Sequence, residues 1–173
     1  MWKPFTICQL AGVPVQFHVT WLIYPASFLV WLLFDYDRPW KMFFALLVLF
    51  VICVSLLAHE FAHVLTARRF GIGSRRVIII PPGALAELES ALDSPNEFWI
   101  TLAGPVASLL LVGIFRVGFH AFASWHESWK VIWLYHWMRA WQFGFKLNLF
   151  MAAFNLMPCF PMDGGRIRGC GGC

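Results

Sequence analysis

Residues 42–70 open with a nearly uninterrupted apolar run, Met42-Phe-Phe-Ala-Leu-Leu-Val-Leu-Phe-Val-Ile-Cys-Val-Ser-Leu-Leu-Ala58, followed directly by His59-Glu60-Phe61-Ala62-His63. We expect one continuous helix through both parts, ended by Gly71, because glycine commonly terminates helices. At 1.5 Å per residue such a helix is about 40 Å long, which is enough to cross the hydrocarbon core of a bilayer. The stretch therefore predicts a membrane-spanning helix that carries ionisable side chains in its second half.

The composition places the whole chain in the same class. Hydrophobic residues make up 60% of the 173 residues and charged residues 13%, against roughly 45–50% and about 25% in soluble domains. So much apolar surface requires contact with lipid, and the length fits a single domain covering residues 1–173. The net charge of +4 comes from basic residues scattered between apolar stretches. That distribution indicates membrane topology signals and argues against a nucleic-acid partner.

Three further apolar stretches are long enough to enter the membrane. They are Val19–Phe34, Phe98–Phe119 and Trp141–Met157. Together with residues 42–70 they predict an all-α membrane protein with about four transmembrane helices.

The connectors between these spans have patterns of their own. After the second span, Val77-Ile-Ile-Ile80, a Pro81-Pro82-Gly83 turn and the run Ala84–Glu89 predict a short β-hairpin. Before the fourth span, tryptophans recur every four residues, which gives an aromatic stripe on a helix. We interpret this segment as an interfacial Trp-rich helix, with substrate binding as the alternative. The tryptophans are Trp125, Trp129, Trp133, Trp137 and Trp141.

The basic residues predict the orientation of the spans. If the N-terminus lies inside, seven basic residues fall on inside segments and four on outside segments, which favours both termini inside. The inside set is Lys3, Arg68, Arg69, Arg75, Arg76, Arg166 and Arg168, and the outside set is Arg38, Lys41, Lys130 and Arg139.

His59-Glu60-Phe61-Ala62-His63 is an H-E-x-x-H motif. On a helix the two histidines lie on one face, one turn apart, so their imidazole nitrogens can occupy adjacent corners of a zinc tetrahedron. Glu60 lies beside them, where a carboxylate can act as a base toward a metal-activated water. The alternative is a pair of packed histidines with Glu60 in an ion pair. We favour the metal site because ionisable groups at membrane depth are costly and usually functional.

A zinc site needs a third protein ligand, and Asp163 is the best candidate. It follows Pro158 and Pro161, which end the fourth span, and precedes Gly164-Gly165, which permits a tight turn. The second and fourth spans run in the same direction across the membrane, so their ends reach the same face. The predicted topology therefore brings Asp163 toward the two histidines.

These motifs resemble the site-2 protease family of intramembrane zinc metalloproteases. The resemblance is carried by Ala58-His-Glu-Phe-Ala-His-Val-Leu-Thr-Ala-Arg-Arg-Phe-Gly71 and by Asn155-x-x-Pro-x-x-Pro-x-Asp-Gly-Gly165. Gly12-Val-Pro-Val-Gln-Phe-His18, Leu102-Ala-Gly-Pro105 and the connector leading to Glu87 add to it. The similarity covers most of residues 8–166.

The resemblance implies a Zn²⁺ ion held by His59, His63 and Asp163, with Glu60 as catalytic base. It implies hydrolysis of a peptide bond in or near a transmembrane segment of another membrane protein, as in regulated intramembrane proteolysis. Asn155 is then a substrate-binding residue, and the Gly83 connector pairs with an unwound substrate strand. From the residues alone, Asn155 could equally bond within the helix bundle, and the connector could be an ordinary turn. The expected location is a bacterial cell membrane, with the active site toward the cytoplasm.

Two other functions are open to the same sequence. One is a catalytically impaired membrane relative that binds substrates without cleaving them, and the other is a metal transporter. Transport would require polar residues leading to the opposite face, whereas His120, His126 and His136 cluster together on the outside. The ending Arg168-Gly-Cys-Gly-Gly-Cys173 departs from the family pattern, and we interpret it as a truncated C-terminus rather than as a metal or redox pair.

Overall fold

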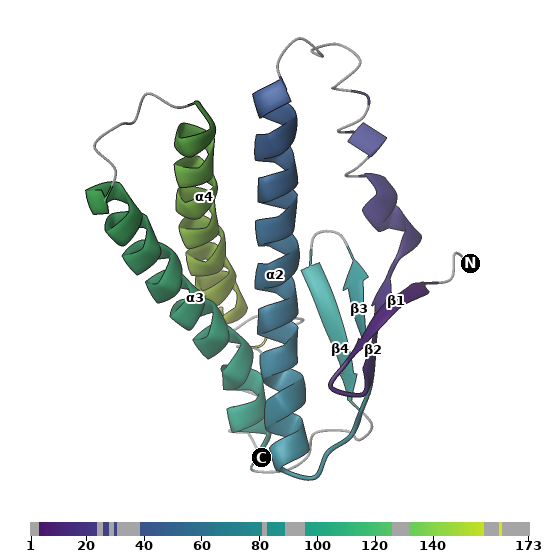
Figure 1. The fold of residues 1–173 in the computed structure, drawn as a ribbon. Coiled ribbons are helices and arrows are strands. Elements are labelled where there is room, and N and C mark those ends of the chain that lie inside the picture. The colour runs from purple at the N-terminus through teal and green to yellow at the C-terminus, as the bar shows by residue number, and fades with distance from the viewer. Residues whose placement is uncertain are drawn as a thin grey trace.

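The computed structural model describes residues 4–23, 26–27, 30, 39–80, 83–88, 96–125, 132–157 and 163. Helix α2 stands between two layers, with a small β-sheet on one side and helices α3 and α4 on the other (Figure 1). In chain order the elements are β1 (Phe5–Leu10), β2 (Val13–Phe17), the 3-10 helix η1 (Val19–Leu22), α2 (Pro39–Arg69), β3 (Ser74–Ile80), β4 (Gly83–Leu88), α3 (Glu97–Trp125) and α4 (Ile132–Asn155).

Helix α2 confirms the prediction for residues 42–70. The apolar run and the H-E-x-x-H motif form one helix, which ends at Arg69 before Gly71, a residue with φ of 76°. Within the described ranges, two helices are long and apolar enough to cross a membrane: Lys41–Arg69 and Glu97–Ala121. The count of four transmembrane helices stays a prediction, and half of the proposed first span lies outside the described residues.

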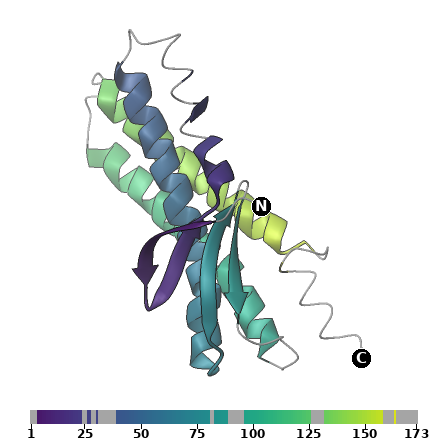
Figure 2. The same ribbon diagram turned by 90° about the vertical axis from the view of Figure 1, so that its right-hand side faces the viewer.

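The sheet contains four strands in the order β1-β2-β3-β4. The predicted hairpin is present, since β3 and β4 are antiparallel and meet at Ile80 and Gly83. In contrast, β2 and β3 are parallel, with Val15 opposite Val77, and the connection between them passes through α2. Figure 2 shows the strands lying beside the C-terminal half of α2.

Alternate side chains of β2 and β3 pack the sheet against α2. Val15 and Ile79 are buried with Leu56 of α2, and Val77 is buried with Val64 about two turns further along the same helix. The side chains that reach α2 are two positions apart on each strand, as expected for one face of a sheet, although Ile78 between them on β3 is buried as well. The sheet therefore holds the half of α2 that carries the H-E-x-x-H motif.

Two features differ from the sequence-based expectation. The description as all-α is wrong for the N-terminal region, because β1 and β2 form an antiparallel hairpin around the turn at Ala11 and Gly12. No separate Trp-rich helix precedes the fourth span within the described residues. Instead, α4 begins at Ile132 and takes in the last three tryptophans of the series, while Trp125 ends α3 and Trp129 lies outside the described residues.

Helices α3 and α4 pack through glycines that face aromatic rings. A Cβ added at Gly144 would lie 2.6 Å from the Phe115 ring, and one at Gly118 would overlap the Trp141 indole. The two rings meet edge to face at 5.4 Å. Small residues allow this close approach of helix backbones in apolar surroundings.

Helix α4 is also joined to α2 by a buried polar contact. The Asn148 side-chain amide donates to the Ser55 hydroxyl at 2.8 Å, and both residues are fully buried. A hydrogen bond between otherwise apolar helices fixes their relative register.

Candidate metal centre

The two histidines of the H-E-x-x-H motif lie on the face of α2 that is turned toward α3. His59 and His63 are 3% and 8% exposed, and their rings lie 5.0 Å apart, edge to face. Asp163 reaches them from more than 90 residues further along the chain. One ligand atom from each of the three residues lies within 4.8 Å of the others. The structure thus brings together the three residues that the sequence predicted as metal ligands.

The outer nitrogen of each imidazole has a partner on α3. His63 Nδ1–H donates to the Ile100 carbonyl at 2.7 Å, which fixes the proton on Nδ1 and leaves a lone pair on Nε2. His59 Nδ1 lies 2.9 Å from the Ser108 hydroxyl oxygen, which can accept in the same way. A metal-ligating histidine commonly has such a partner on its other ring nitrogen. His63 Nε2 is therefore in the form needed to bind a metal ion, and His59 Nε2 takes the same form when the Ser108 hydroxyl accepts from Nδ1–H.

The spacing of the ligand atoms provides a quantitative test of this interpretation. His59 Nε2 lies 3.3 Å from His63 Nε2, and Asp163 Oδ2 lies 3.3 and 3.4 Å from these two nitrogens. In a tetrahedral zinc site with bonds of about 2.0–2.1 Å, neighbouring ligand atoms are about 3.3 Å apart. The three atoms thus form one face of a zinc-sized tetrahedron and leave the fourth corner for another ligand.

Gly104 of α3 makes room for the imidazoles. A Cβ at this position would overlap the His63 ring and lie 2.7 Å from His59 Nε2. By contrast, a Cβ at Gly113 on the same helix would meet nothing within 4 Å. Any side chain at position 104 would therefore displace at least one of the two imidazoles.

Sequence reasoning did not predict this role of α3. Gly104 and Ser108 form a small-residue pair four positions apart, which is typical of simple helix packing in lipid. The only signal for more was the place of Gly104 in Leu102-Ala-Gly-Pro105, a stretch that resembles the site-2 protease family. The contact of Ile100 with His63 could not be predicted from the sequence, because it uses a backbone carbonyl and every residue has one.

Glu60 is 9% exposed and joins α2 to the sheet. Its Oε2 accepts a hydrogen bond of 2.9 Å from the Ala86 backbone N–H. In an antiparallel pair of strands, a backbone N–H that does not point toward the partner strand points toward the opposite, unpaired edge of its own strand. The edge of β4 that is not paired with β3 therefore faces the side of α2 that carries Glu60.

Next to Ala86, Glu87 pairs across the hairpin with Arg76. The guanidinium donates two hydrogen bonds, of 2.8 and 2.9 Å, to the Glu87 carboxylate, and both side chains are partly exposed. The hydrogen bonds from Arg76 hold the pKa of Glu87 below its ordinary value. This ion pair fixes the register of β3 and β4 at the level of Glu60.

The two predicted substrate-binding residues lie at the ends of elements. Gly83 is the first residue of β4 and stands opposite Ile80. Asn155 is the last residue of α4, and its amide donates to the Met151 carbonyl at 3.0 Å. This hydrogen bond lies within α4, and it corresponds to the structural role predicted from the sequence as the alternative to substrate binding by Asn155. Over the described residues, no hydrogen bond joins either residue to the three ligand atoms.

The sequence profile of peptidase family M50 matches residues 47–169. A zinc metalloprotease of Methanocaldococcus jannaschii is 26% identical over 159 residues, which are 92% of this chain and 42% of that protein. Stage IV sporulation protein FB of Bacillus subtilis is 30% identical over 121 residues, covering 68% of this chain and 38% of that protein. The chain thus spans less than half the length of either relative.

A solved structure has the same fold. The site-2 protease from Methanocaldococcus jannaschii matches with a TM-score of 0.68, covering 96% of this chain and 70% of that one at 20% sequence identity. At this identity the likeness shows the shared arrangement of helices and sheet.

Proposed function

The chain belongs to peptidase family M50, and we propose on that basis that it is an intramembrane zinc metalloprotease. It hydrolyses a peptide bond in or near a transmembrane segment of another membrane protein. One observation carries the proposal: His59 Nε2, His63 Nε2 and Asp163 Oδ2 lie 3.3–3.4 Å apart beside the Glu60 carboxylate. Two imidazoles, one carboxylate and an open fourth position are the ligand set of catalytic zinc.

Each residue has a chemical role in this proposal. Bound zinc would lower the pKa of a water molecule toward about 7 and polarise the scissile carbonyl. Glu60 takes the proton from the attacking water and passes it to the leaving amine. Its Oε2 is engaged by Ala86, so Oε1 is the oxygen that receives the proton. Ser108 and the Ile100 carbonyl hold the imidazoles with their Nε2 atoms directed at the metal.

The substrate segment is proposed to bind in an extended conformation along the free edge of β4. A transmembrane helix buries its backbone carbonyls in its own hydrogen bonds, so a scissile peptide must first unwind. Strand addition to a sheet edge holds such a segment through its main chain and needs no particular sequence. Gly83 starts the edge that leads to Ala86 and Glu60. Asn155 can contribute to the same binding if it exchanges its bond to Met151 for a substrate carbonyl.

The proposed setting is a bacterial cell membrane, with the metal site nearer the cytoplasmic face. His59 lies ten residues, about 15 Å, before Arg69, the basic end of α2. The site is then below the membrane surface but close enough for water to reach it from that side. The orientation rests on the distribution of Lys and Arg described above.

The decisive test is a Glu60→Gln variant, assayed with a membrane-protein substrate in detergent or nanodiscs. Gln keeps the shape but cannot accept a proton, so we expect zinc content to be unchanged and the cleavage rate to fall by about 10²–10⁴-fold. Glu87→Gln serves as the matched control, because it removes the carboxylate of the residue next to Ala86, which is bonded to Arg76 and not to Glu60, and it should cleave at nearly the original rate. Full-rate cleavage by a zinc-loaded Glu60→Gln protein would overturn the assignment. If the original chain binds zinc and substrate but cleaves nothing, the non-catalytic alternative holds instead.

A further inference from the structure

Two cations of the helix bundle take no part in the metal site. Arg116 lies within the candidate span Glu97–Ala121 of α3, and Lys146 lies in α4. Both side chains are exposed on the surface of the helix pair. In a membrane, charged side chains within spanning segments are costly and usually pair with something or mark a site.

Arg116 and Lys146 line the same cavity. It has a volume of about 220 Å³ and lies between α3 and α4 alone, away from α2. The Arg116 guanidinium also lies 5.8 Å from the centre of the Phe145 ring, which can hold it by a cation–π contact. The cavity therefore combines two positive charges with apolar walls. Its lining consists of Phe115, Arg116, Phe119, Trp141, Gln142, Phe145 and Lys146.

Within the described part of the chain, neither cation forms an ion pair with a carboxylate. Two acidic residues of the described bundle are engaged at the metal site: Asp163 with the two histidines, and Glu60 with Ala86. The described residues therefore give the cavity a positive charge without a counter-charge. In a bilayer such a charge favours an anionic ligand.

The depth of the cavity suits a lipid headgroup. Arg116 lies twelve residues, about 18 Å, beyond Gly104, which marks the level of the metal site. It lies five residues, about 8 Å, before the end of the candidate span at Ala121. Long cationic side chains at that depth reach the membrane interface with their charged ends. The cavity thus opens near the face of the membrane opposite to the metal site.

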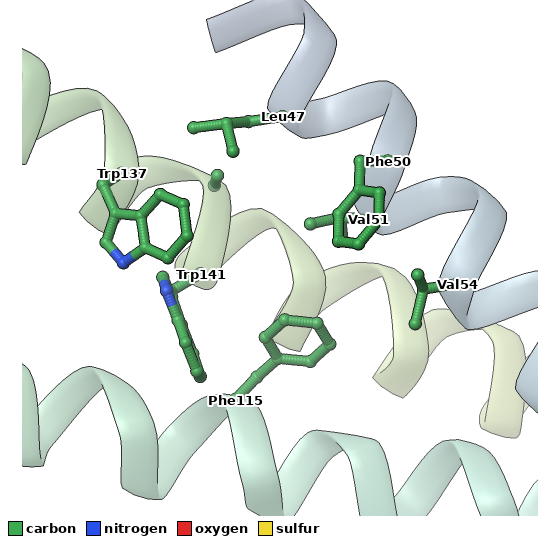
Figure 3. Close-up of a pocket in the computed structure, with 8 residues that line it drawn as sticks. Leu47, Phe50, Val51, Val54, Phe115, Trp137 and Trp141 are labelled. Carbon is green, nitrogen blue, oxygen red and sulfur yellow. The ribbon is translucent and has the colours of Figure 1, made fainter.

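A second cavity makes an amphiphilic ligand more suitable than a small free anion. It has a volume of about 100 Å³, lies among α2, α3 and α4, and is lined only by apolar side chains (Figure 3). Phe115 and Trp141 line both cavities. A charged compartment and an apolar compartment therefore adjoin the same aromatic pair.

We propose that the cavity between α3 and α4 binds an anionic phospholipid. Its phosphate lies between Arg116 and Lys146, the Gln142 amide donates to the headgroup, and an acyl chain packs on the aromatic rings. Basic pockets between transmembrane helices are a recognised means of holding such headgroups. The inference rests on the membrane setting of the proposed function, but not on the cleavage reaction.

The test uses the full chain in nanodiscs of phosphatidylcholine alone or of phosphatidylcholine and phosphatidylglycerol in equal parts. Native mass spectrometry after gentle extraction counts retained lipid, and a thermal melt reports stability. The original chain should retain phosphatidylglycerol in preference to phosphatidylcholine and melt at a higher temperature when it is present. Arg116→Gln with Lys146→Gln should weaken retention at least ~10-fold, because two charge-assisted hydrogen bonds are lost.

Two controls separate charge at this site from charge in general. Arg139→Gln removes an exposed cation of α4 that bonds to Tyr135 outside the cavity, and it should retain the lipid normally. Arg116→Lys with Lys146→Arg keeps both charges and should also retain it. If the double Gln variant does not fold, the single Gln variants decide by the same criterion. Zinc content checks the fold, and since cleavage is not measured, a failure of the protease assignment would leave this result unaffected.

Three results would overturn the proposal. One is equal retention of the two lipids by the original chain, and another is undiminished retention by the Gln variants. The third is an equal rise in melting temperature with soluble glycerol 3-phosphate, which would show a site for free anions rather than for a lipid.

Discussion

The two ends of the helix bundle are built with the same device and used differently. At the metal-site end, Gly104 of α3 faces the imidazoles of His59 and His63. At the other end, Gly118 and Gly144 face the rings of Trp141 and Phe115. In both places a glycine lets an aromatic ring approach a neighbouring helix backbone.

The difference lies in what the ring has to do. At the metal-site end the rings carry ligand atoms, their outer nitrogens are hydrogen-bonded, and small displacements change the metal geometry. At the other end Phe115 and Trp141 carry no ligand atoms; they pack α3 against α4 and border a cavity that reaches α2 (Figure 3). Substitutions at the first end should therefore affect chemistry, and those at the second should affect stability and lipid retention without changing the metal site.

The largest effect at the metal-site end is expected from Gly104→Ala. The new Cβ would overlap the His63 ring and approach His59 Nε2 to 2.7 Å, so at least one ligand must move. We expect zinc affinity to fall more than ~100-fold, beyond the range typical for loss of a supporting hydrogen bond. Zinc content after dialysis against a chelator of known affinity, followed by a cleavage assay, measures the effect.

Gly113→Ala is the matched control for this substitution. It lies on the same helix and its added methyl group would meet nothing within 4 Å. Alanine also has the higher helix propensity, so zinc affinity should be unchanged and stability equal or slightly raised. If Gly104→Ala bound zinc as well as Gly113→Ala, the close approach of α3 to the metal ligands would have no functional meaning.

A smaller effect at the same end is expected from Ser108→Ala. It removes the hydroxyl that bonds to His59 Nδ1 at 2.9 Å and leaves the ring nitrogen buried without that partner. Loss of such a supporting contact typically lowers metal affinity or activity by about 10–100-fold. The same chelator competition measures it.

Ser108→Thr is the conservative counterpart, since it keeps the hydroxyl and adds a methyl group. Partial recovery of zinc affinity with Thr would identify the hydrogen bond as the cause. Equal loss with Ala and Thr would instead indicate that the space at position 108 matters, because Ser108 is fully buried.

These contacts also show what could be predicted from the sequence. Helix α2 and the shared face of His59 and His63 could, because the apolar run and the four-residue histidine spacing are local patterns. Asp163 could be placed because two helices that run in the same direction end on the same face. Gly104 could not, since a small residue has the same sequence pattern whether it faces a helix backbone or a metal ligand.

The N-terminal strands were missed for a different reason. β1 is exposed along its whole length, so it has no alternation of buried and exposed side chains to reveal it. β2 pairs with β3, a partner about sixty residues away, and that parallel pairing is visible only once α2 has brought the strands together. Single-sequence patterns report local periodicity and carry no information about such distant pairing.

At the other end of the bundle, Gly118→Ala should lower stability without changing the metal site. A methyl group there would overlap the Trp141 indole, so this bulky ring would have to shift from its packing against Phe115. Overpacking of this kind typically costs about 1–3 kcal/mol. Gly144→Ala should act similarly, because its Cβ would lie 2.6 Å from Phe115. Thermal melts and zinc titration together check both variants.

The informative result is whether the melting temperature falls while the zinc affinity stays unchanged. If either variant lost zinc in proportion to its loss of stability, the two ends of the bundle would be coupled. Asn148 would then be the first residue to examine, because it joins α4 to α2 one turn before His59, through Ser55.

The smallest expected effect comes from the Arg76–Glu87 ion pair, which contrasts with the buried metal ligands by being partly exposed. Its hydrogen bonds hold the pKa of Glu87 below the ordinary value. The pair therefore stabilises the fold above the unfolded pKa of Glu, about 4.3, and this contribution is lost as the pH falls through the lower folded value. Glu87→Gln should lower the melting temperature slightly at neutral pH, by less than Gly118→Ala does, since exposed pairs contribute little. The difference from the original chain should begin to shrink near the unfolded pKa of Glu, about 4.3, and vanish once the pH lies below the lower folded pKa of Glu87; it should also shrink at high salt. A difference that stayed constant from neutral to acidic pH would show that the amide disturbs β4 itself, and that the ion pair is not what holds the hairpin beside Glu60.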